Sequence, residues 1–183
     1  HHVYECTLLS QRGPWEGCLE EIRLAERIRQ NVNLRDLGKA TADIVENCKI
    51  SVSLSDPRRP DVPLLAVSDE FERMTGYDAT EIIGHNCRFL NNDCHMDVKR
   101  RSELRKCCLT GAPISMVVEN RRKNGNKFMN YLHLRGLSIA TDVETGENVW
   151  YLIGMQSDLT DMCDEDGQLL DQTLPETMAA VAE

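Results

Sequence analysis

The stretch Gly84-His85-Asn86-Cys87-Arg88-Phe89-Leu90-Asn91 is the most informative segment of this 183-residue chain. It places a single thiol beside a guanidinium group at the end of a predicted short helix. Free cysteine is among the most buried residue types and usually serves as inert packing. The role of Cys87 therefore depends on which residues the rest of the chain brings to it.

Composition and charge limit the classes of protein to which the chain can belong. A hydrophobic fraction of 41% in 183 residues suffices for one domain-sized core with some flanking structure. The net charge of -9 argues against nucleic acid as a partner, because nucleic-acid binders carry a basic surface. No apolar run reaches the roughly 18 residues that cross a bilayer, and no secretory leader opens the chain. We therefore expect a soluble, cytoplasmic protein with no membrane partner.

The eight cysteines show no repeating spacing and no CxxC pair, which favours reduced thiols over a disulfide framework. Cys94-His95 and the vicinal pair Cys107-Cys108 lack the second pair of ligands that a structural zinc site needs. We expect no metal site.

The chain divides into a core domain and flanking segments. Residues 1–16 show no periodicity and are predicted to be a disordered tail, in which His1 and His2 are typical of a tag remnant. Residues 17–47 are predicted to form N-terminal flanking helices, one of them amphipathic from Leu19 to Ile28 and a second from Leu34 to about Glu46. Residues 48–160 form the predicted core. Residues 161–183 are an acidic flanking segment that is predicted to be helical near Pro175.

The core alternates strands and helices in a fixed order. Period-two alternation in Ile50, Val52 and Leu54 predicts a half-buried first strand. Further strands are predicted at residues 63–67, 114–121, 127–139 and 148–159, with a hairpin at Asn124-Gly125. Two strands, several helices and three strands predict an α+β domain with a five-stranded antiparallel sheet and short helices on one face, which is the layout of a PAS fold.

The predicted helices have sequence signals at their ends. The pairs Asp69/Glu72 and Asp78/Glu81 can each act as a capping box, and Gly76 and Gly84 suit the helix ends. A longer helix is expected from about Asp97 to Leu109, and its inner stripe is expected to consist of Val98, Leu104, Cys107 and Cys108.

Three amide side chains fall where a core should hold carbon. Asn120 shares a strand face with apolar residues of its strand, Asn130 does so on the next strand, and Gln156 does so on the last. An unpaired buried amide costs on the order of 1 to 3 kcal/mol, so three on one face favour a bound heterocycle with alternating donors and acceptors. The pyrimidine edge of a flavin has this pattern, and Asn or Gln can match it.

The chain resembles the light-oxygen-voltage (LOV) photosensors, which are PAS-fold flavoproteins, from about Ile50 to Thr160. The resemblance rests first on the Cys87 stretch and on Asp56-Pro57-Arg58-Arg59-Pro60-Asp61. It extends to Met74-Thr75-Gly76-Tyr77, to Asn126-Lys127-Phe128-Met129-Asn130 and to Tyr151-Leu152-Ile153-Gly154-Met155-Gln156.

The resemblance implies a blue-light sensor with FMN as chromophore. Cys87 would be the nucleophile that forms a reversible adduct with the C4a carbon of the flavin, and Gln156 would re-pair and pass the signal through the last strand to flanking helices or a dimer interface. Guanidinium groups bind phosphate by charge-assisted hydrogen bonds, and the family's phosphate-binding arginines correspond to Arg88 and Arg105. The predicted cofactor-binding residues are Asn86, Arg88, Asn91, Arg105, Asn120, Asn130, Leu132, Leu152 and Gln156.

The chain also departs from the family pattern. Asn91 stands where the family usually has Gln, one methylene longer, and Val62 stands where it usually has Asn. The loop between Asn91 and Arg105 is one residue longer than is common, which weakens the assignment of Arg105 more than that of Cys87.

Two other classes of function compete with the photosensor. Cys94 and Arg100 have the C-x5-R spacing of a cysteine phosphatase, but the loop between them contains Asp97 and no glycine, so it would repel an anionic substrate. We therefore predict that the chain is not an enzyme. The more serious alternative is a non-photochemical PAS module that binds another ligand or mediates dimerisation. The chain contains no catalytic or DNA-binding module that would identify its effector domain or partner protein. The apolar stripe from Leu19 to Ile28 is expected to pack on the outer face of the sheet or on the same stripe of a second copy, which would form a homodimer.

Overall fold

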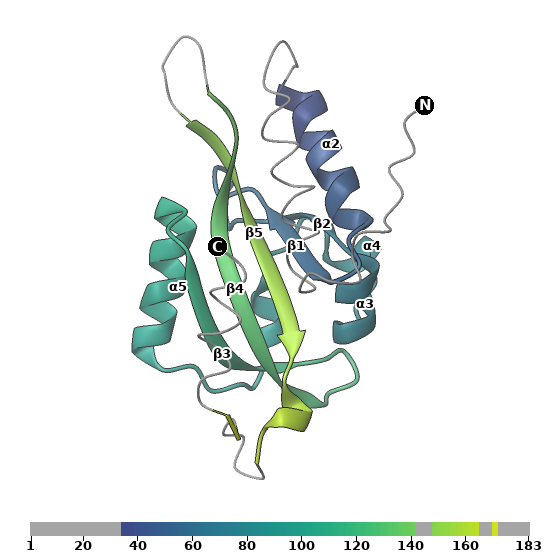
Figure 1. Ribbon diagram of the computed structural model, residues 1–183, viewed down its shortest axis with the longest axis vertical. Coiled ribbons are helices and arrows are strands. Elements are labelled where there is room, and N and C mark those ends of the chain that lie inside the picture. Colours follow the sequence, from purple (N-terminus) through teal and green to yellow (C-terminus); the bar gives the residue numbers. More distant parts are fainter. Residues whose placement is uncertain (1–33, 142–147, 165–169, 172–183) are drawn as a thin grey trace.

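The computed structural model describes residues 34–141, 148–164 and 170–171 (Figure 1). Their elements are α2 (Leu34–Glu46), β1 (Ser51–Ser55), β2 (Leu64–Val67), α3 (Asp69–Thr75), α4 (Ala79–Ile82), the 3-10 helix η1 (Cys87–Asn91), α5 (Val98–Thr110), β3 (Ile114–Arg121), β4 (Lys127–Thr141), β5 (Asn148–Asp158) and the 3-10 helix η2 (Thr160–Met162). The predicted tail at 1–16, the amphipathic stretch from Leu19 to Ile28 and the predicted helix near Pro175 lie outside the described residues.

The five strands form one antiparallel sheet in the order β2-β1-β5-β4-β3. β1 pairs with β5, with Ser51 opposite Gln156, so the first and last strands of the core are neighbours. β3 and β4 form the predicted hairpin, and Gly125 in its loop has a φ of 91°, a conformation that glycine adopts without strain. The α+β class and the five-stranded PAS layout are therefore confirmed.

α2 covers one face of the sheet. Val45 of α2 belongs to a buried cluster with Val52 and Leu54 of β1 and with outward-facing residues of β4 and β5. The helix approaches β5 closely: a Cβ atom on Gly38 would lie 2.5 Å from the hydroxyl oxygen of Tyr151. A side chain at position 38 would therefore require Tyr151 or α2 to shift.

The prediction that β1 is half-buried is wrong, because both faces of the sheet are covered. All five residues of β1 are buried. Val52 and Leu54 pack under α2, whereas Ser53 and Ser55 line a cavity on the opposite face. The alternation correctly separates the two faces of the strand, but the polar face points into the protein.

The short helices and α5 lie on the cavity side of the sheet, where α3 contacts β1 and α5 contacts β3 and β4 (Figure 1). The predicted capping box at Asp78 and Glu81 is confirmed for α4. For α3 the prediction is wrong by one residue: the cap is Ser68, whose Oγ accepts a hydrogen bond from the backbone N of Phe71 at 3.2 Å. Ser68 Oγ also donates to the carbonyl of Ile50, so this cap ties α3 to the start of β1.

The ends of two helices also follow the sequence only in part. Gly76 caps the end of α3 with a φ of 77°, as predicted, whereas α4 ends at Ile82, has Ile83 as its C-cap and is followed by Gly84 with a φ of 86°. α5 begins after its N-cap Asp97 and ends at Thr110, with Gly111 as its C-cap.

The predicted inner stripe of α5 holds for three of its four members. Cys107 is buried, and Leu104 and Cys108 line the cavity. Val98, the first residue of the helix, is 81% exposed, so the prediction is wrong at this position.

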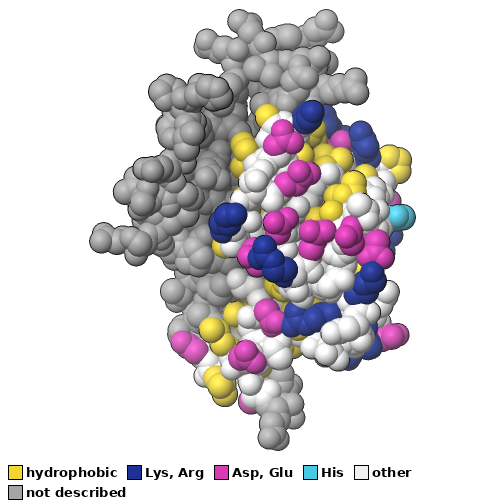
Figure 2. Space-filling model, turned by 90° about the vertical axis from the view of Figure 1, so that its right-hand side faces the viewer, with side chains coloured by type: hydrophobic (Ala, Val, Ile, Leu, Met, Phe, Trp, Pro, Cys, Tyr) yellow, Lys and Arg dark blue, Asp and Glu magenta, His cyan; other side chains and the backbone are white. Residues whose placement is uncertain are grey.

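Acidic and basic side chains are interspersed over the face that lies on the right of Figure 1, as Figure 2 shows. Exposed ion pairs of the described residues include Lys123 with Glu81 and Arg73 with Glu70. Among the residues that the structure describes, no helix has the length and apolar character that are needed to span a bilayer.

Candidate functional site

A cavity of about 160 Å³ lies between the inner face of the sheet, η1 and α5. Polar groups from several elements line it, together with apolar side chains. The lining residues are Ser53, Ser55, Val62, Asn86, Cys87, Arg88, Leu90, Asn91, Met96, Leu104, Cys108, Val118, Asn120, Asn130, Leu132, Leu134, Leu152 and Gln156. Every predicted site residue except Arg105 is in this set, so the fold brings together residues that are as far apart in sequence as Asn86 and Gln156.

Asn86 positions the helix that carries the thiol. Its Oδ1 accepts a hydrogen bond from the backbone N of Arg88 at 2.9 Å, which caps η1. Its Nδ2 donates to the carbonyls of Asp61 and Val62 in the turn before β2. Asn86 therefore fixes the start of η1 against the turn before β2, and Cys87 follows directly.

Cys87 is a half-buried free thiol at the cavity wall. Burial raises the pKa of this thiol to about 12, while a hydrogen bond with the hydroxyl of Ser53 lowers it. Desolvation disfavours the thiolate because a charge is poorly solvated in an apolar environment. Cys87 is therefore held as a neutral thiol at physiological pH, and it needs a strongly electrophilic partner in order to react.

Three asparagines form a hydrogen-bonded chain across the cavity. Asn130 Nδ2 donates to Asn120 Oδ1 at 2.8 Å, and Asn120 Nδ2 donates to Asn91 Oδ1 at 2.8 Å. The Oδ1 atom of Asn130 is buried and has no hydrogen-bond partner within the protein. Asn130 is 1% exposed, so this oxygen is an unsatisfied acceptor beside the cavity.

Serines of β1 hold the amide of Gln156 at both ends. The Ser51 hydroxyl donates to Gln156 Oε1 at 3.2 Å, and Gln156 Nε2 donates to Ser53 Oγ at 3.1 Å. These contacts follow from the strand register, in which Ser51 lies opposite Gln156 and Ser53 lies opposite Gly154.

Arg88 is the only positively charged residue among the described residues that line the cavity. Its guanidinium forms an ion pair with Asp61, whose backbone φ of 68° lies in the left-handed region. Arg105 is exposed on α5 and does not line the cavity. The structure therefore places one of the two predicted phosphate-binding arginines at the site.

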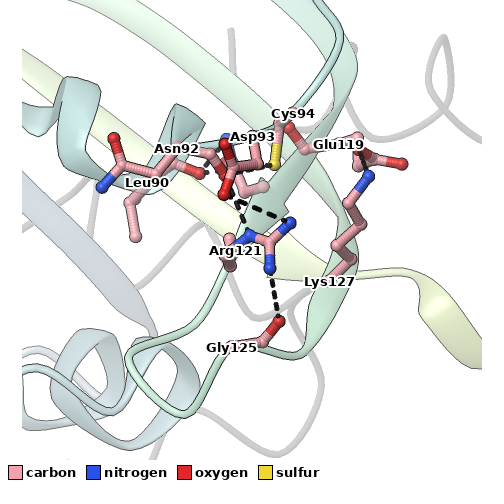
Figure 3. Close-up of polar contacts among 9 residues, drawn as sticks. Leu90, Asn92, Asp93, Cys94, Glu119, Arg121, Gly125 and Lys127 are labelled. Atoms are coloured by element: carbon pink, nitrogen blue, oxygen red, sulfur yellow. Dashed lines mark hydrogen bonds and ion pairs between the residues drawn. The ribbon is translucent and has the colours of Figure 1, made fainter.

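The loop after η1 is attached to the hairpin by Arg121 of β3, as Figure 3 shows. Arg121 donates to the carbonyl of Asn92 at 2.9 Å and to the carbonyl of Gly125 at 3.1 Å. Cys94 lies in this loop beside Glu119, and burial raises the pKa of its thiol. The attachment keeps the C-terminal end of η1, and with it Asn91, next to β3.

Sequence reasoning missed several lining residues, among them Ser53, Ser55, Met96 and Cys108. The serines carried a signal, because they occupy every second position of a predicted strand. Cys108 was placed on the inner stripe of its helix, but its exposure to a cavity depends on the packing of α5 against β3 and β4. Met96 lies in a loop and had no periodic signal.

The lining fits a flavin. Apolar residues such as Leu132, Leu134 and Leu152 can contact the faces of a planar ring, and the amides can pair with its polar edge. The unsatisfied Asn130 Oδ1 calls for a ligand that donates a hydrogen bond. Within the described residues, no group of three or more His, Cys, Asp or Glu side chains could hold a metal ion.

Comparisons with known proteins agree with this geometry. The family model of the PAS domain matches residues 54–161. Phototropin-1A of Oryza sativa subsp. japonica is 32% identical over 129 residues, which are 70% of this chain and 13% of the rice protein. A blue-light-activated histidine kinase of Rhizobium johnstonii is 29% identical over 126 residues, which are 69% of this chain and 35% of the kinase.

A similar solved structure is the LOV domain of the Erythrobacter litoralis EL346 blue-light-activated histidine kinase. It has a TM-score of 0.53 and 29% identity, and the match covers 61% of this chain and 97% of that domain. The chain thus spans a small part of its full-length relatives but nearly all of an isolated LOV domain.

Proposed function

We propose that this chain, which belongs to the PAS domain family and to its light-oxygen-voltage group, is a blue-light sensor that binds FMN and bonds reversibly to it through Cys87. The observation that carries the proposal is that one cavity is lined by the Cys87 thiol and by three buried amides, those of Asn120, Asn130 and Gln156. Relatives named as phototropins and as blue-light-activated histidine kinases support the light-sensing role.

The amides would hold the polar edge of the flavin. Asn130 offers its unsatisfied Oδ1 to a ring N–H group. Asn120 is oriented between Asn130 and Asn91, which fixes how its donor and acceptor are presented. Because the chain already fixes these side chains, little ordering is left for the ligand to impose.

Arg88 would bind the phosphate of FMN. The guanidinium pairs with Asp61 across an exposed contact, in which both side chains are more than half exposed. Such an ion pair contributes only about 0 to 1 kcal/mol, so a dianionic phosphate can displace the carboxylate at little cost. Arg105 would need to change its side-chain conformation to reach the same group.

The bound flavin supplies light absorption and an excited state in which its ring carbon C4a is electrophilic. Cys87 would be the residue that bonds reversibly to the flavin ring, and its thiol would supply the proton that the ring takes up. The raised pKa of Cys87 keeps this proton on the thiol beforehand, so the chain needs no separate proton donor.

The test is the absorbance of protein purified in the dark. A structured blue absorption band should bleach on blue illumination and return in darkness. Titration with FMN and with riboflavin, on wild type and on Arg88→Ala, measures the phosphate contribution, which should disappear in the variant. A preparation that stays colourless after flavin has been added would contradict the proposal.

We also propose that the signal leaves through β5. Gln156 lies on its inner face, and Tyr151 on its outer face contacts α2 at Gly38. Light should therefore change the docking of α2 or the oligomeric state, as measured by scattering in light and darkness. Gln156→Leu should abolish that change and leave the bleaching intact. An equal response in the variant would exclude this route.

A further inference from the structure

We propose that Ser53 is a positioning residue that joins the Cys87 thiol to the Gln156 amide in one hydrogen-bonded chain. Ser53 is 4% exposed on β1 and lines the cavity together with both partners. Its effect on the thiol is independent of the ligand. Its effect on light signalling rests on the function proposed above.

The orientation of the Gln156 amide is set by its two serine contacts. The Ser51 hydroxyl donates to Oε1, which leaves Nε2 pointing at Ser53, and Ser53 Oγ accepts from it at 3.1 Å. With its oxygen accepting from the amide, Ser53 has its own hydroxyl proton left to donate. Cys87 lines the same cavity and can take this proton, and a hydrogen bond from the Ser53 side chain lowers the pKa of its thiol.

The direction of the chain is therefore from the Gln156 amide to the Ser53 hydroxyl and on to the Cys87 sulfur. A hydroxyl that donates to sulfur stabilises the thiolate, and this agrees with the lowering of the Cys87 pKa that Ser53 causes. Hydrogen bonds in series polarise one another, so the amide strengthens the bond between serine and sulfur.

Gly154 makes room for this arrangement. A Cβ atom at position 154 would lie 2.9 Å from Ser53 Oγ and 3.0 Å from Gln156 Nε2. Both atoms of the Ser53–Gln156 hydrogen bond are thus packed against a position that has no side chain. A side chain at position 154 would therefore displace one or both of these polar atoms.

A consequence for signalling follows from this geometry. When the Cys87 sulfur forms a new bond, its hydrogen bond with the Ser53 hydroxyl weakens or breaks. The same hydroxyl contacts the side-chain amide of Gln156 on β5. Gln156 would thus sense the thiol from the β1 side as well as from the ligand side. Ser53 does not bond to the ligand in this scheme and acts only through Cys87 and Gln156.

The experiment measures the reactivity of Cys87 towards methyl methanethiosulfonate as a function of pH, in the full chain in the dark. Mass spectrometry of the tryptic peptide that ends at Arg88 follows this thiol alone, because Cys87 is the only cysteine between Arg73 and Arg88. Ser53→Val and Ser53→Thr form the matched pair, since the two side chains have nearly the same shape and only Thr keeps the hydroxyl. Ser55→Ala is the control on the same strand face.

Loss of one hydrogen bond to a charged group should move the pH profile of Ser53→Val upward by about one pH unit, which is about a tenfold lower rate at a given pH. Ser53→Thr should retain most of the wild-type rate, and Ser55→Ala should match wild type. In a Gln156→Leu background, Ser53→Val should slow the reaction by a smaller factor, because the amide no longer polarises the hydroxyl.

Equal rates in wild type and Ser53→Val, or equal slowing in Ser55→Ala, would overturn the proposal. Neither outcome depends on photochemistry. If wild type fails to bleach in light but the thiol profile shifts as expected, the proposed light sensing fails and the role of Ser53 stands. If wild type bleaches and the profile does not shift, the reverse holds.

Discussion

Asn130→Leu should change flavin affinity and protein stability by different amounts, because it removes one buried oxygen atom that has no partner in the ligand-free protein. In the ligand-free protein, the buried Oδ1 of Asn130 has no partner, and its Nδ2 makes one hydrogen bond of 2.8 Å to Asn120. A buried acceptor without a partner costs about 1 to 3 kcal/mol, and a made hydrogen bond contributes about 1 kcal/mol. Leucine removes the unsatisfied oxygen of Asn130 but leaves the buried Oδ1 of Asn120 without its donor. The two costs are of similar size and opposite in effect, so the free energy of unfolding of the flavin-free protein should change by no more than about 1 kcal/mol.

The same substitution should weaken flavin binding strongly. A ligand that donates to Asn130 Oδ1 satisfies the acceptor, whereas a leucine side chain at this position would leave the ligand's own N–H group unpaired in the cavity. At about 2 kcal/mol for that loss, the Kd should rise by roughly thirtyfold. Binding and stability should thus respond differently to one change, whereas a general packing defect would lower both.

Urea unfolding of flavin-free protein and fluorescence titration with FMN measure the two quantities. Met129→Leu is the matched control, since Met129 is adjacent on β4 and does not line the cavity. An FMN affinity in Asn130→Leu within a factor of two of wild type would refute the assignment of Asn130 as a ligand contact. A large loss of stability without flavin would refute the argument about its unsatisfied oxygen.

Three further predictions follow from the site. Cys87→Ala should keep flavin and its fluorescence but lose bleaching, whereas Cys108→Ala, at the same cavity, should still bleach; reversible bleaching in Cys87→Ala would identify another thiol as the nucleophile. Asn91→Gln should slow dark recovery and tighten flavin binding by about 1 kcal/mol. The longer amide reaches further into the cavity while it can still accept a hydrogen bond from Asn120. Unchanged or faster recovery would show that Asn91 already fills the space and makes the contacts expected of the longer side chain. Burial raises the pKa of the Cys87 and Cys107 thiols to about 12 from an ordinary value near 9.0, so the folded protein holds both protons more tightly than the unfolded chain. The free energy of unfolding of flavin-free protein should therefore fall as pH rises from about 9 toward 12, and it should fall less steeply in Cys87→Ala. Urea midpoints measured across that pH range test this expectation. The same pH dependence of the midpoint in both proteins would contradict it.

The convergence of the amides was predictable because it depends only on parity. Strand residues alternate between faces, and the pairing of Arg121 with Lys127 leaves an odd number of loop residues between the arms. That places Asn120 and Asn130 on one face, whatever helices cover the sheet. Gln156 joins them by the same alternation on β5.

The serines of β1 were not assigned to the site, because periodicity does not reveal what covers a face. Ser51, Ser53 and Ser55 alternate with apolar residues, which is typical of a strand with one face in water. Here the second face closes a cavity, so the polar residues are buried. The contact between Arg88 and Asp61 was also beyond sequence reasoning, since it depends on a turn in which Asp61 takes a positive φ.

The strand β5 connects the cavity on one face of the sheet with the buried cluster under α2 on the other face. Successive residues of β5 face the cavity and α2 in turn, so Gln156 and Met155 belong to opposite faces although they are neighbours in sequence. Met155 is fully buried in the cluster that includes Val45 of α2. A rotation of the Gln156 amide that disturbs its bonds to Ser51 and Ser53 would alter the pairing of β5 with β1, and both faces share that backbone. Because closely packed interiors transmit small displacements, the cavity needs no direct contact with α2 to affect how that helix docks.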